Sequence, residues 1–446
     1  MKKLIILGGG ESGIGAALLG KAKGFDVFLS DLNSLQDHFR DRLYQQEIPF
    51  EEKTHTEEVI LGADLVIKSP GIPEKSAIVQ KIREKNIPIF SEIEFASRYT
   101  QARIIAITGS NGKTTTTLLT YHLLKSAGWN VGLAGNVGKS FAEQVLLNDY
   151  DHFVLELSSF QLDDIYDFRA DISVLLNITP DHLDRYDYIF DNYVRSKFKI
   201  LLNQLPHNSF IYNADDPVIA RELTSRQLAV NRFPVSLKGG NNAVAQLTTQ
   251  GLVFHLPDHP TKVIPFEKLP LKGPHNYMNI MSAVLAASQA GLAFEAIESG
   301  LTTFQNAPHR LEKVAVIDGV EYINDSKATN VDSVYYALQS FESPIILLIG
   351  GVDKGNDYDA IKDLVQTKVK GVIALGKDNV KLEHYFEPIV PLFFATDDLN
   401  KALEKAREWA TPKDVVLLSP ACASFDLFNN YEDRGNRFRE AVLSFA

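Results

Sequence analysis

The chain has 446 residues, 45% of them hydrophobic and 23% charged, which is typical of a soluble globular protein with two or three domains. Its net charge of −11 argues against a general binder of nucleic acid or membrane surfaces, because such proteins present broad basic faces. Anionic small molecules are not excluded, since a local cluster of lysines and backbone N–H groups outweighs the overall field at short range.

The first predicted unit, residues 1–97, alternates short apolar runs with helical patterns, as Rossmann-like α/β domains do. Its expected strands are Leu4–Leu7, Val27–Ser30 and Leu65–Lys68. The apolar run after Met1 ends at Gly8, too soon for the core of a signal peptide, and no later run reaches the length of a membrane span. We therefore expect a cytoplasmic protein that does not enter membranes.

A glycine-rich turn follows the first strand. Residues Gly8-Gly9-Gly10-Glu11-Ser12-Gly13 match the pattern G-x-G-x-x-G, and Asp31 ends the second strand, as in dinucleotide-binding folds. The motif is weak on its own, Glu11 puts a negative charge into the turn, and no catalytic residue supports hydride transfer. An NAD(P)-dependent dehydrogenase is therefore a minor alternative.

The second unit, residues 98–300, carries a phosphate-binding loop. Thr108-Gly109-Ser110-Asn111-Gly112-Lys113-Thr114-Thr115 joins a buried strand, Ile104–Thr108, to the helical pattern Thr115–Ser126. In such a turn backbone N–H groups face an anion, Lys113 meets the outer phosphates and Thr114 holds Mg²⁺ through its hydroxyl. Gly109 lies three residues before Gly112, where the standard loop has five. The pattern still predicts a nucleoside triphosphate site.

Two residues near strand ends of this unit offer metal ligands. The expected strands Phe153–Leu157 and Ile172–Ile178 bring Glu156 and His182 to the edge where open parallel sheets bind ligands. A mixed oxygen and imidazole set suits Mg²⁺ or Mn²⁺ beside phosphates. The patterns also predict a strand over Ser209–Tyr212 and a helix over Asn192–Leu202.

The third unit, residues 301–446, is predicted to be a second Rossmann-like α/β domain, which makes the chain a three-domain α/β protein with mainly parallel sheets. Asp318-Gly319 predicts a hairpin between Val314–Ile317 and Val320–Ile323. Cys422 is the only cysteine, so no disulfide forms within the chain, and we expect it to pack rather than to react. Three more strands and one helix are expected at Ile345–Ile349, Val372–Leu375, Val415–Leu418 and Leu399–Trp409.

These motifs together resemble the Mur ligase family over essentially the whole chain. The shared segments are Thr108–Thr114, Gly135-Asn136-Val137-Gly138, Glu156, Asp181-His182, Tyr193-Val194-Arg195-Ser196-Lys197, Gly273–Asn279 and Pro308-His309-Arg310. Two C-terminal segments, Asn324–Asn330 and Leu418–Asp426, are similar to those of the members that add D-glutamate. The arginine-containing motif of the diamino-acid-adding members is not found.

The resemblance implies roles for individual residues. Lys197, rather than Lys199, corresponds to the family lysine that carries a CO₂-derived carbamate. The implied metal ligands are Thr114, Glu156, His182 and Lys197, and the implied catalytic residues are Lys113, Glu156, His182 and Lys197. The residues implied to bind ATP are Gly109, Ser110, Asn111, Gly112, Lys113, Thr114, Thr115, Asn276, Asn279, Arg310 and Asp325. Those implied to bind the substrates are Ser12, Asp31, Ser69 and Gly71 at the UDP end, Asn136 and Ser158, and then Lys327, Thr329, Lys354 and Ser424, of which the last three are the expected D-glutamate contacts.

By the same resemblance the chain is expected to be an ATP- and Mg²⁺-dependent ligase, a monomer in the cytoplasm that binds neither nucleic acid nor membrane. Its expected reaction adds D-glutamate to UDP-N-acetylmuramoyl-L-alanine through an acyl phosphate. A Mur-type or folate polyglutamate ligase with another amino acid is an alternative that residues 326–330 and 419–424 count against. A non-catalytic nucleotide-binding protein is another, and it is expected to lack some of the four catalytic residues, all of which are present.

Overall fold

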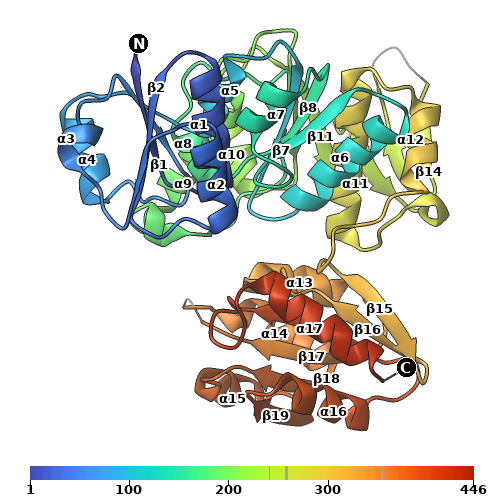
Figure 1. Cartoon of the computed structure of the whole chain (residues 1–446). Helices are drawn as coiled ribbons and strands as arrows, with labels where there is room; N and C mark the ends of the chain where they lie inside the picture. The colour runs from blue at the N-terminus through green and yellow to red at the C-terminus, as the bar shows by residue number, and fades with distance from the viewer. Residues whose placement is uncertain (241, 257–259, 354, 446) are drawn as a thin grey trace. The chain divides into compact units, whose positions relative to one another are not determined.

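The computed structural model describes residues 1–240, 242–256, 260–353 and 355–445, which form an α/β protein with three sheets (Figure 1). The chain divides into two compact units, Met1–Pro270 with Met278–Phe304, and Leu271–Tyr277 with Gln305–Ala446. The first unit holds two of the sheets and the second unit holds the third. The predicted α/β fold with three domains is confirmed, whereas the boundaries near residues 97 and 300 stay predictions.

The first sheet is fully parallel, with the strand order β3-β2-β1-β4-β5. Its strand order reverses between β1 and β4, and the crevice beyond the carboxyl ends of two such strands is where open α/β sheets bind ligands. The strands are β1 (Lys3–Leu7), β2 (Asp26–Asp31), β3 (Phe50–Glu52), β4 (Leu65–Lys68) and β5 (Ile89–Phe90). The helices are α1 (Glu11–Ala22), α2 (Asp37–Gln45), α3 (Glu57–Ile60), α4 (Ala77–Glu84) and α5 (Glu92–Ser97).

The second sheet has nine strands in the order β14-β13-β12-β11-β10-β9-β6-β8-β7, and only β12, β13 and β14 pair antiparallel. Its strands are β6 (Arg103–Thr108), β7 (Val131–Gly135), β8 (His152–Glu156), β9 (Ile172–Leu175), β10 (Ser209–Asn213), β11 (Asn231–Ser236), β12 (Ala245–Thr248), β13 (Gly251–Phe254) and β14 (Lys262–Ile264). The α-helices of this region are α6 (Lys113–Ser126), α7 (Phe141–Leu147), α8 (Ser159–Asp163), α9 (Phe190–Phe198), α10 (Pro217–Ser225), α11 (Pro274–Ala290) and α12 (Phe294–Leu301). Three 3₁₀-helices accompany them, η1 (Leu183–Arg185), η2 (Lys199–Leu201) and η3 (Phe266–Lys268).

The first two sheets share one hydrophobic core. Leu4 and Ile14 of the first domain and Phe141 and Phe153 of the second belong to the same cluster of buried side chains. Helix α1 packs directly on α7 (Figure 1). The approach is so close that a Cβ at Gly15 would lie 1.8 Å from the hydroxyl oxygen of Ser140. The first two domains therefore form one body.

The third sheet, β15-β16-β20-β17-β18-β19, is parallel except for the β15–β16 hairpin. Alternate residues of β17 point to opposite faces, so that Ile345 and Leu347 enter one core and Ile346 and Leu348 enter the other. The strands are β15 (Glu312–Ile317), β16 (Val320–Asn324), β17 (Ile345–Gly350), β18 (Val369–Leu375), β19 (Leu392–Thr396) and β20 (Val415–Ala421). The helices are α13 (Val331–Gln339), η4 (Tyr358–Ile361), α14 (Lys362–Lys368), α15 (Val380–Phe386), α16 (Leu399–Trp409) and α17 (Tyr431–Leu443).

Two sequence predictions are corrected at their ends. The strand expected over Ile172–Ile178 stops at Leu175, because the next backbone and side-chain groups bond to the phosphate loop and to Asp216. The helix expected over Asn192–Leu202 begins at Phe190 and changes from α to 3₁₀ geometry after Phe198. The predicted Asp318-Gly319 hairpin is confirmed, with positive φ at both turn residues.

Candidate active site

The phosphate loop runs from the carboxyl end of β6 to the first turn of α6, as predicted. Gly112 caps the helix with a φ of 85°, a conformation that glycine adopts without steric cost. A Cβ at this position would lie 2.3 Å from Oδ1 of Asn279, so the side chain of Asn279 lies directly against the loop. The backbone N–H groups at the start of this helix form a natural site for an anion.

Hydrogen bonds from the segment after β9 hold the loop in shape. The Ser110 hydroxyl donates to the carbonyl of Thr179 at 2.9 Å and lies 2.9 Å from the Tyr193 hydroxyl. The Asn111 N–H donates to the Asn177 side chain at 2.8 Å, and the Asn177 amide donates back to the Asn111 carbonyl at 3.0 Å. Asn177 was not predicted, because it lies 66 residues from its partner and belongs to no recognisable motif.

Two lysines converge on one carbonyl of the loop. The Lys113 ammonium donates to the carbonyls of Gly109 and Ser110, each at 2.8 Å. The Lys197 amine donates to the same Gly109 carbonyl at 2.9 Å and to the Thr108 hydroxyl at 3.2 Å. Burial, reinforced by the charge of Lys113, lowers the pKa of Lys197 well below its ordinary value. Lys199 points elsewhere and donates to the Asp163 carbonyl.

Glu156 ends β8, the strand next to β6, and its carboxylate is buried. One oxygen accepts a hydrogen bond from the Asn136 amide at 2.7 Å. The other oxygen has no hydrogen-bond partner within the part of the chain that the structure describes. A buried carboxylate oxygen needs a partner, and this one suits a bound cation.

His182 lies in the turn after β9, with a positive φ of 51° and a side chain that is 48% exposed. Its Nε2 is 3.5 Å from a carboxylate oxygen of Asp181, and its ring meets the Phe160 ring edge to face. Ser158, another predicted residue, caps α8 by a reciprocal pair of hydrogen bonds with Gln161. The Ser158 hydroxyl therefore already has a structural role.

A cavity of about 500 Å³ opens beyond the carboxyl ends of β1 and β4. It is lined by all four residues expected at the UDP end of the substrate, namely Ser12, Asp31, Ser69 and Gly71, and also by His55, which the sequence did not single out.

The Asp31 carboxylate holds the backbone at the edge of this cavity. It accepts hydrogen bonds from the backbone N–H groups of Gly9 at 2.6 Å and Asn33 at 2.7 Å, which closes the glycine turn. Glu11 is exposed and does not line the cavity. Its charge therefore lies outside the cavity wall.

The second compact unit brings the two C-terminal signature segments side by side. The Asp325 N–H donates to the Leu418 carbonyl at 2.8 Å, and the Ser419 hydroxyl donates to the Asp325 carboxylate at 3.0 Å. Burial raises the pKa of Asp325 to about 7. The Lys327 ammonium lies over the Tyr431 ring, 4.9 Å from its centre.

The other predicted residues of this unit are mostly held by local contacts. The Asn276 amide donates to the Lys272 carbonyl at 2.8 Å, the Thr329 N–H donates to the Lys327 carbonyl at 3.0 Å, and Ser424 is buried. Arg310 follows His309, whose ring is buried beside α17. Lys354 lies outside the described residues.

Arg434 of α17 joins the same two segments and was not predicted. Its guanidinium donates to the Ser326 carbonyl at 2.8 Å, the Ser326 hydroxyl at 3.0 Å and the Cys422 carbonyl at 3.2 Å. The side chain is only 2% exposed. No salt bridge to Arg434 is formed by the described residues, so backbone carbonyls carry most of its interactions. Arg434 thus fixes the geometry of both segments.

Three family descriptions match successive parts of the chain. Residues 3–78 match the MurD N-terminal domain, residues 107–287 the Mur ligase middle domain, and residues 309–422 the Mur ligase glutamate ligase domain. A Cytophaga hutchinsonii protein named UDP-N-acetylmuramoylalanine–D-glutamate ligase is 51% identical over 100% of this chain and 99% of its own. The chain belongs to the Mur ligase family. A Bacteroides fragilis protein of the same name is 49% identical over 99% of both chains.

A solved Mur ligase has the same fold as this chain. The MurF ligase of Thermotoga maritima, in complex with ADP, superposes with a TM-score of 0.61 at 16% identity, covering 94% of this chain and 96% of its own. Within the described part of the Mur ligase chain, no group of three or more His, Cys, Asp or Glu side chains is placed to hold a metal. The predicted ligand set includes only two such residues, Glu156 and His182, so it stays a prediction. No described helix is long and apolar enough to span a membrane.

Proposed function

We propose that this Mur ligase joins D-glutamate to UDP-N-acetylmuramoyl-L-alanine at the expense of ATP. The observation that carries the proposal is the pair of relatives with that printed name, about half identical to this chain along their whole length. The geometry agrees with it, because a phosphate loop and a separate ligand cavity lie in one compact unit. We also propose that the enzyme is a cytoplasmic monomer.

The proposed reaction has two steps. The alanyl carboxylate first attacks the γ-phosphorus of ATP, which forms an acyl phosphate and releases ADP. The D-glutamate amine then attacks the acyl carbon, a tetrahedral intermediate forms, and phosphate leaves as the amine loses a proton. Lys113 and the N–H groups at the start of α6 stabilise charge on the transferring phosphoryl group. Asn136 orients the Glu156 carboxylate, at the end of the strand next to β6, through its 2.7 Å hydrogen bond.

Mg²⁺ is the proposed cofactor, held by Thr114, Glu156, His182 and a carbamate on Lys197, and when bound it neutralises charge on the phosphates. The partnerless buried oxygen of Glu156 fits a cation at this place. The buried position of Lys197 fits the modification, because a neutral amine is the form that adds to CO₂ and releases a proton. Both side chains reach the Gly109 carbonyl, so the resulting anion would lie close to the Lys113 ammonium and would be stabilised by its positive charge.

Substrate contacts are proposed in three groups. Residues 109–115, with Asn276, Asn279, Arg310 and Asp325, bind ATP. Ser12, Asp31, Ser69 and Gly71 bind the UDP end in the 500 Å³ cavity that they line. Asn136, Ser158, Lys327, Thr329, Lys354 and Ser424 bind the reacting end and D-glutamate, since lysines and hydroxyls are suitable partners for its two carboxylates.

The test is phosphate release from ATP with UDP-N-acetylmuramoyl-L-alanine, with D-glutamate, L-glutamate or meso-diaminopimelate as the acceptor. Release that requires D-glutamate and gives a product heavier by one glutamate residue supports the proposal. Release with another acceptor keeps the ligase chemistry and overturns the assigned amino acid. No release from folded protein with Mg²⁺ and bicarbonate favours a binding protein without ligase activity.

A further inference from the structure

The loop of residues 69–73 forms one wall of the N-terminal cavity. All five of its residues, Ser69, Pro70, Gly71, Ile72 and Pro73, line the cavity. A second cavity, of about 510 Å³, opens beside the same loop, and Pro73 lines both. Ile72 packs against a core of the first domain, but much of the rest of the loop faces open space. Polar contacts therefore add to packing in holding the loop.

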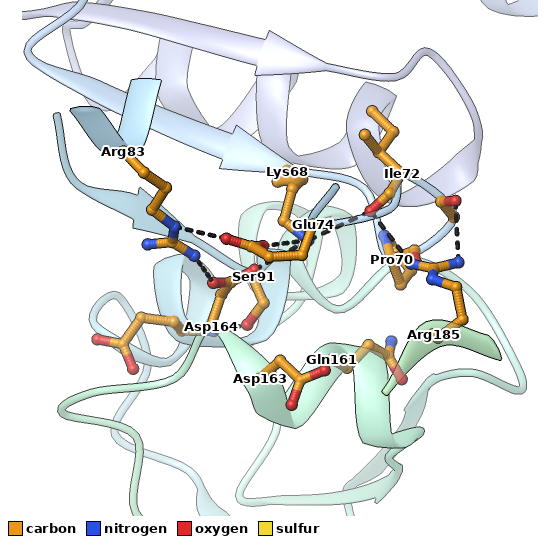
Figure 2. Close-up of polar contacts among 12 residues, drawn as sticks. Lys68, Pro70, Ile72, Glu74, Arg83, Ser91, Gln161, Asp163, Asp164 and Arg185 are labelled. Atoms are coloured by element: carbon orange, nitrogen blue, oxygen red, sulfur yellow. Dashed lines mark hydrogen bonds and ion pairs between the residues drawn. The ribbon is translucent and has the colours of Figure 1, made fainter. Parts of the chain in front are cut away.

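Arg185 of the central domain supplies the central contacts (Figure 2). Its guanidinium donates to three successive carbonyls of the loop, Pro70 at 3.2 Å, Gly71 at 3.2 Å and Ile72 at 3.1 Å. The group is planar and presents five N–H donors, so it serves several acceptors at once without moving. Its central carbon lies over the Phe160 ring, 4.4 Å from the ring centre. Arg185 is thus fixed on one side and bound to the loop on the other.

Two further contacts from the central domain hold the ends of the loop. The buried ammonium of Lys68, just before the loop, lies 3.1 Å from a carboxylate oxygen of Asp164, which Arg83 also contacts (Figure 2). After the loop, the Lys75 ammonium donates to the carbonyl of Asp184 at 3.4 Å. The loop is therefore tied to the central domain before, along and after its length.

The attachment point of Arg185 lies next to the predicted metal ligand. Arg185 is the last residue of η1, and His182 is the residue that caps this turn. The Arg185 N–H donates to the His182 carbonyl at 3.0 Å. One short turn thus carries both the guanidinium that holds the cavity wall and the imidazole proposed for the catalytic centre.

We propose that Arg185 is a positioning residue for the ligase reaction, which fixes the wall of the UDP cavity relative to the His182 turn. The inference rests on the proposed function, because it requires the substrate to occupy the cavity at one end and to react near His182 at the other. A long substrate that bridges two sites reacts only when their separation is held. Arg185 holds this separation by binding the loop carbonyls. It acts on the reaction only through the position of the loop.

The experiment compares Arg185→Met and Arg185→Lys with Arg221→Met in the full-length enzyme. Arg221 is a matched control, because it lies on the same domain, is itself half exposed, and among the described residues its guanidinium contacts the side chains of Asp191 and Glu222 rather than the loop. We expect Arg185→Met to raise KM for UDP-N-acetylmuramoyl-L-alanine at least about tenfold, with KM for ATP within about twofold. The KM of Arg185→Lys for UDP-N-acetylmuramoyl-L-alanine should lie between those of Arg185→Met and Arg221→Met, since an ammonium group binds fewer of the three carbonyls.

The outcomes separate the inference from the function. If wild-type enzyme releases phosphate with D-glutamate but Arg185→Met behaves like Arg221→Met, the inference is overturned and the function stands. An equal increase in KM for UDP-N-acetylmuramoyl-L-alanine and for ATP, or a fall in kcat alone, also overturns the inference. Should Arg185→Met prove unstable, Arg185→Lys and calorimetric titration with UDP decide the matter, because weaker UDP binding is expected only if the cavity wall has moved. Failure of the wild-type enzyme with every acceptor overturns the proposed function itself.

Discussion

Replacing Arg434 by methionine should weaken the second compact unit and its glutamate site together. Methionine keeps the apolar bulk of the side chain but removes every donor of the guanidinium. The Ser326 and Cys422 carbonyls then lose donors at 2.8 and 3.2 Å in a region with almost no access to water. Both carbonyls belong to the two signature segments, so the change acts on the segments that carry the proposed D-glutamate contacts.

The size of the effect follows from two opposing contributions. Leaving a buried carbonyl without its donor costs about 1–3 kcal/mol, hence roughly 2–6 kcal/mol for the pair. Removing a buried charge that has no carboxylate partner among the described residues works in the opposite direction. We therefore expect a net loss of about 2–3 kcal/mol, which lowers the melting temperature of a unit of this size by roughly 4–12 °C.

Thermal unfolding and steady-state kinetics measure the two consequences. Arg437→Met is the control, because Arg437 lies on the same helix, is 54% exposed and pairs with Asp433 on the surface. KM for D-glutamate should rise in Arg434→Met and remain near the wild-type value in the control. Arg434 does not hold the two segments if Arg434→Met melts within about 1 °C of wild type and keeps its KM for D-glutamate.

Three other changes test separate features. Gly112→Ala should raise KM for ATP about tenfold, because positive φ costs an alanine about 1–2 kcal/mol and its Cβ would press on Asn279. Gly128→Ala is the control: Gly128 has a similar φ and open space around it, so this change should lower stability and leave KM for ATP unchanged. Glu92→Gln should flatten the pH dependence of the melting temperature. Burial raises the pKa of Glu92 to about 7, so the stability that the protonated acid contributes is present below pH 4.5 and is lost as the pH rises through 7. A melting temperature with an unchanged slope from pH 5 to 8 would contradict this. Lys197→Ala should abolish turnover and remove a carbamate carbon signal seen after exposure to ¹³CO₂, and a signal that persists would place the carbamate elsewhere.

Residues close in sequence to a strand end were predictable, because the sheet itself determines where they lie. Gly112 and Lys113 follow β6 directly, and Ser12 and Ser69 follow β1 and β4, so strand pairing alone brings them to the loop and the cavity. Lys197 reaches the Gly109 carbonyl of the phosphate loop, and the carbamate that the family resemblance implies for it stays a prediction. Composition and periodicity did not distinguish Lys197 from Lys199.

The contacts that hold the site were not predictable, because each joins segments far apart in the chain. Asn177 meets Asn111 across 66 residues, Arg185 meets Ile72 across 113, and Arg434 meets Ser326 across 108. Asparagine and arginine on a surface turn or helix are common in any sequence and carry no local signal of such a partner. Only the fold shows which of them are buried against a backbone carbonyl.

The core shared by the first two sheets determines which part of the chain can be exchanged in a hybrid of two related ligases. A protein cut near residue 97 would uncover the apolar faces of α1 and α7 and separate Phe141 from the first-domain side chains of its cluster. Such halves should aggregate rather than fold. A natural or engineered hybrid that changes the amino acid added is therefore expected to inherit the first two domains as a single block and to replace the chain beyond Phe304.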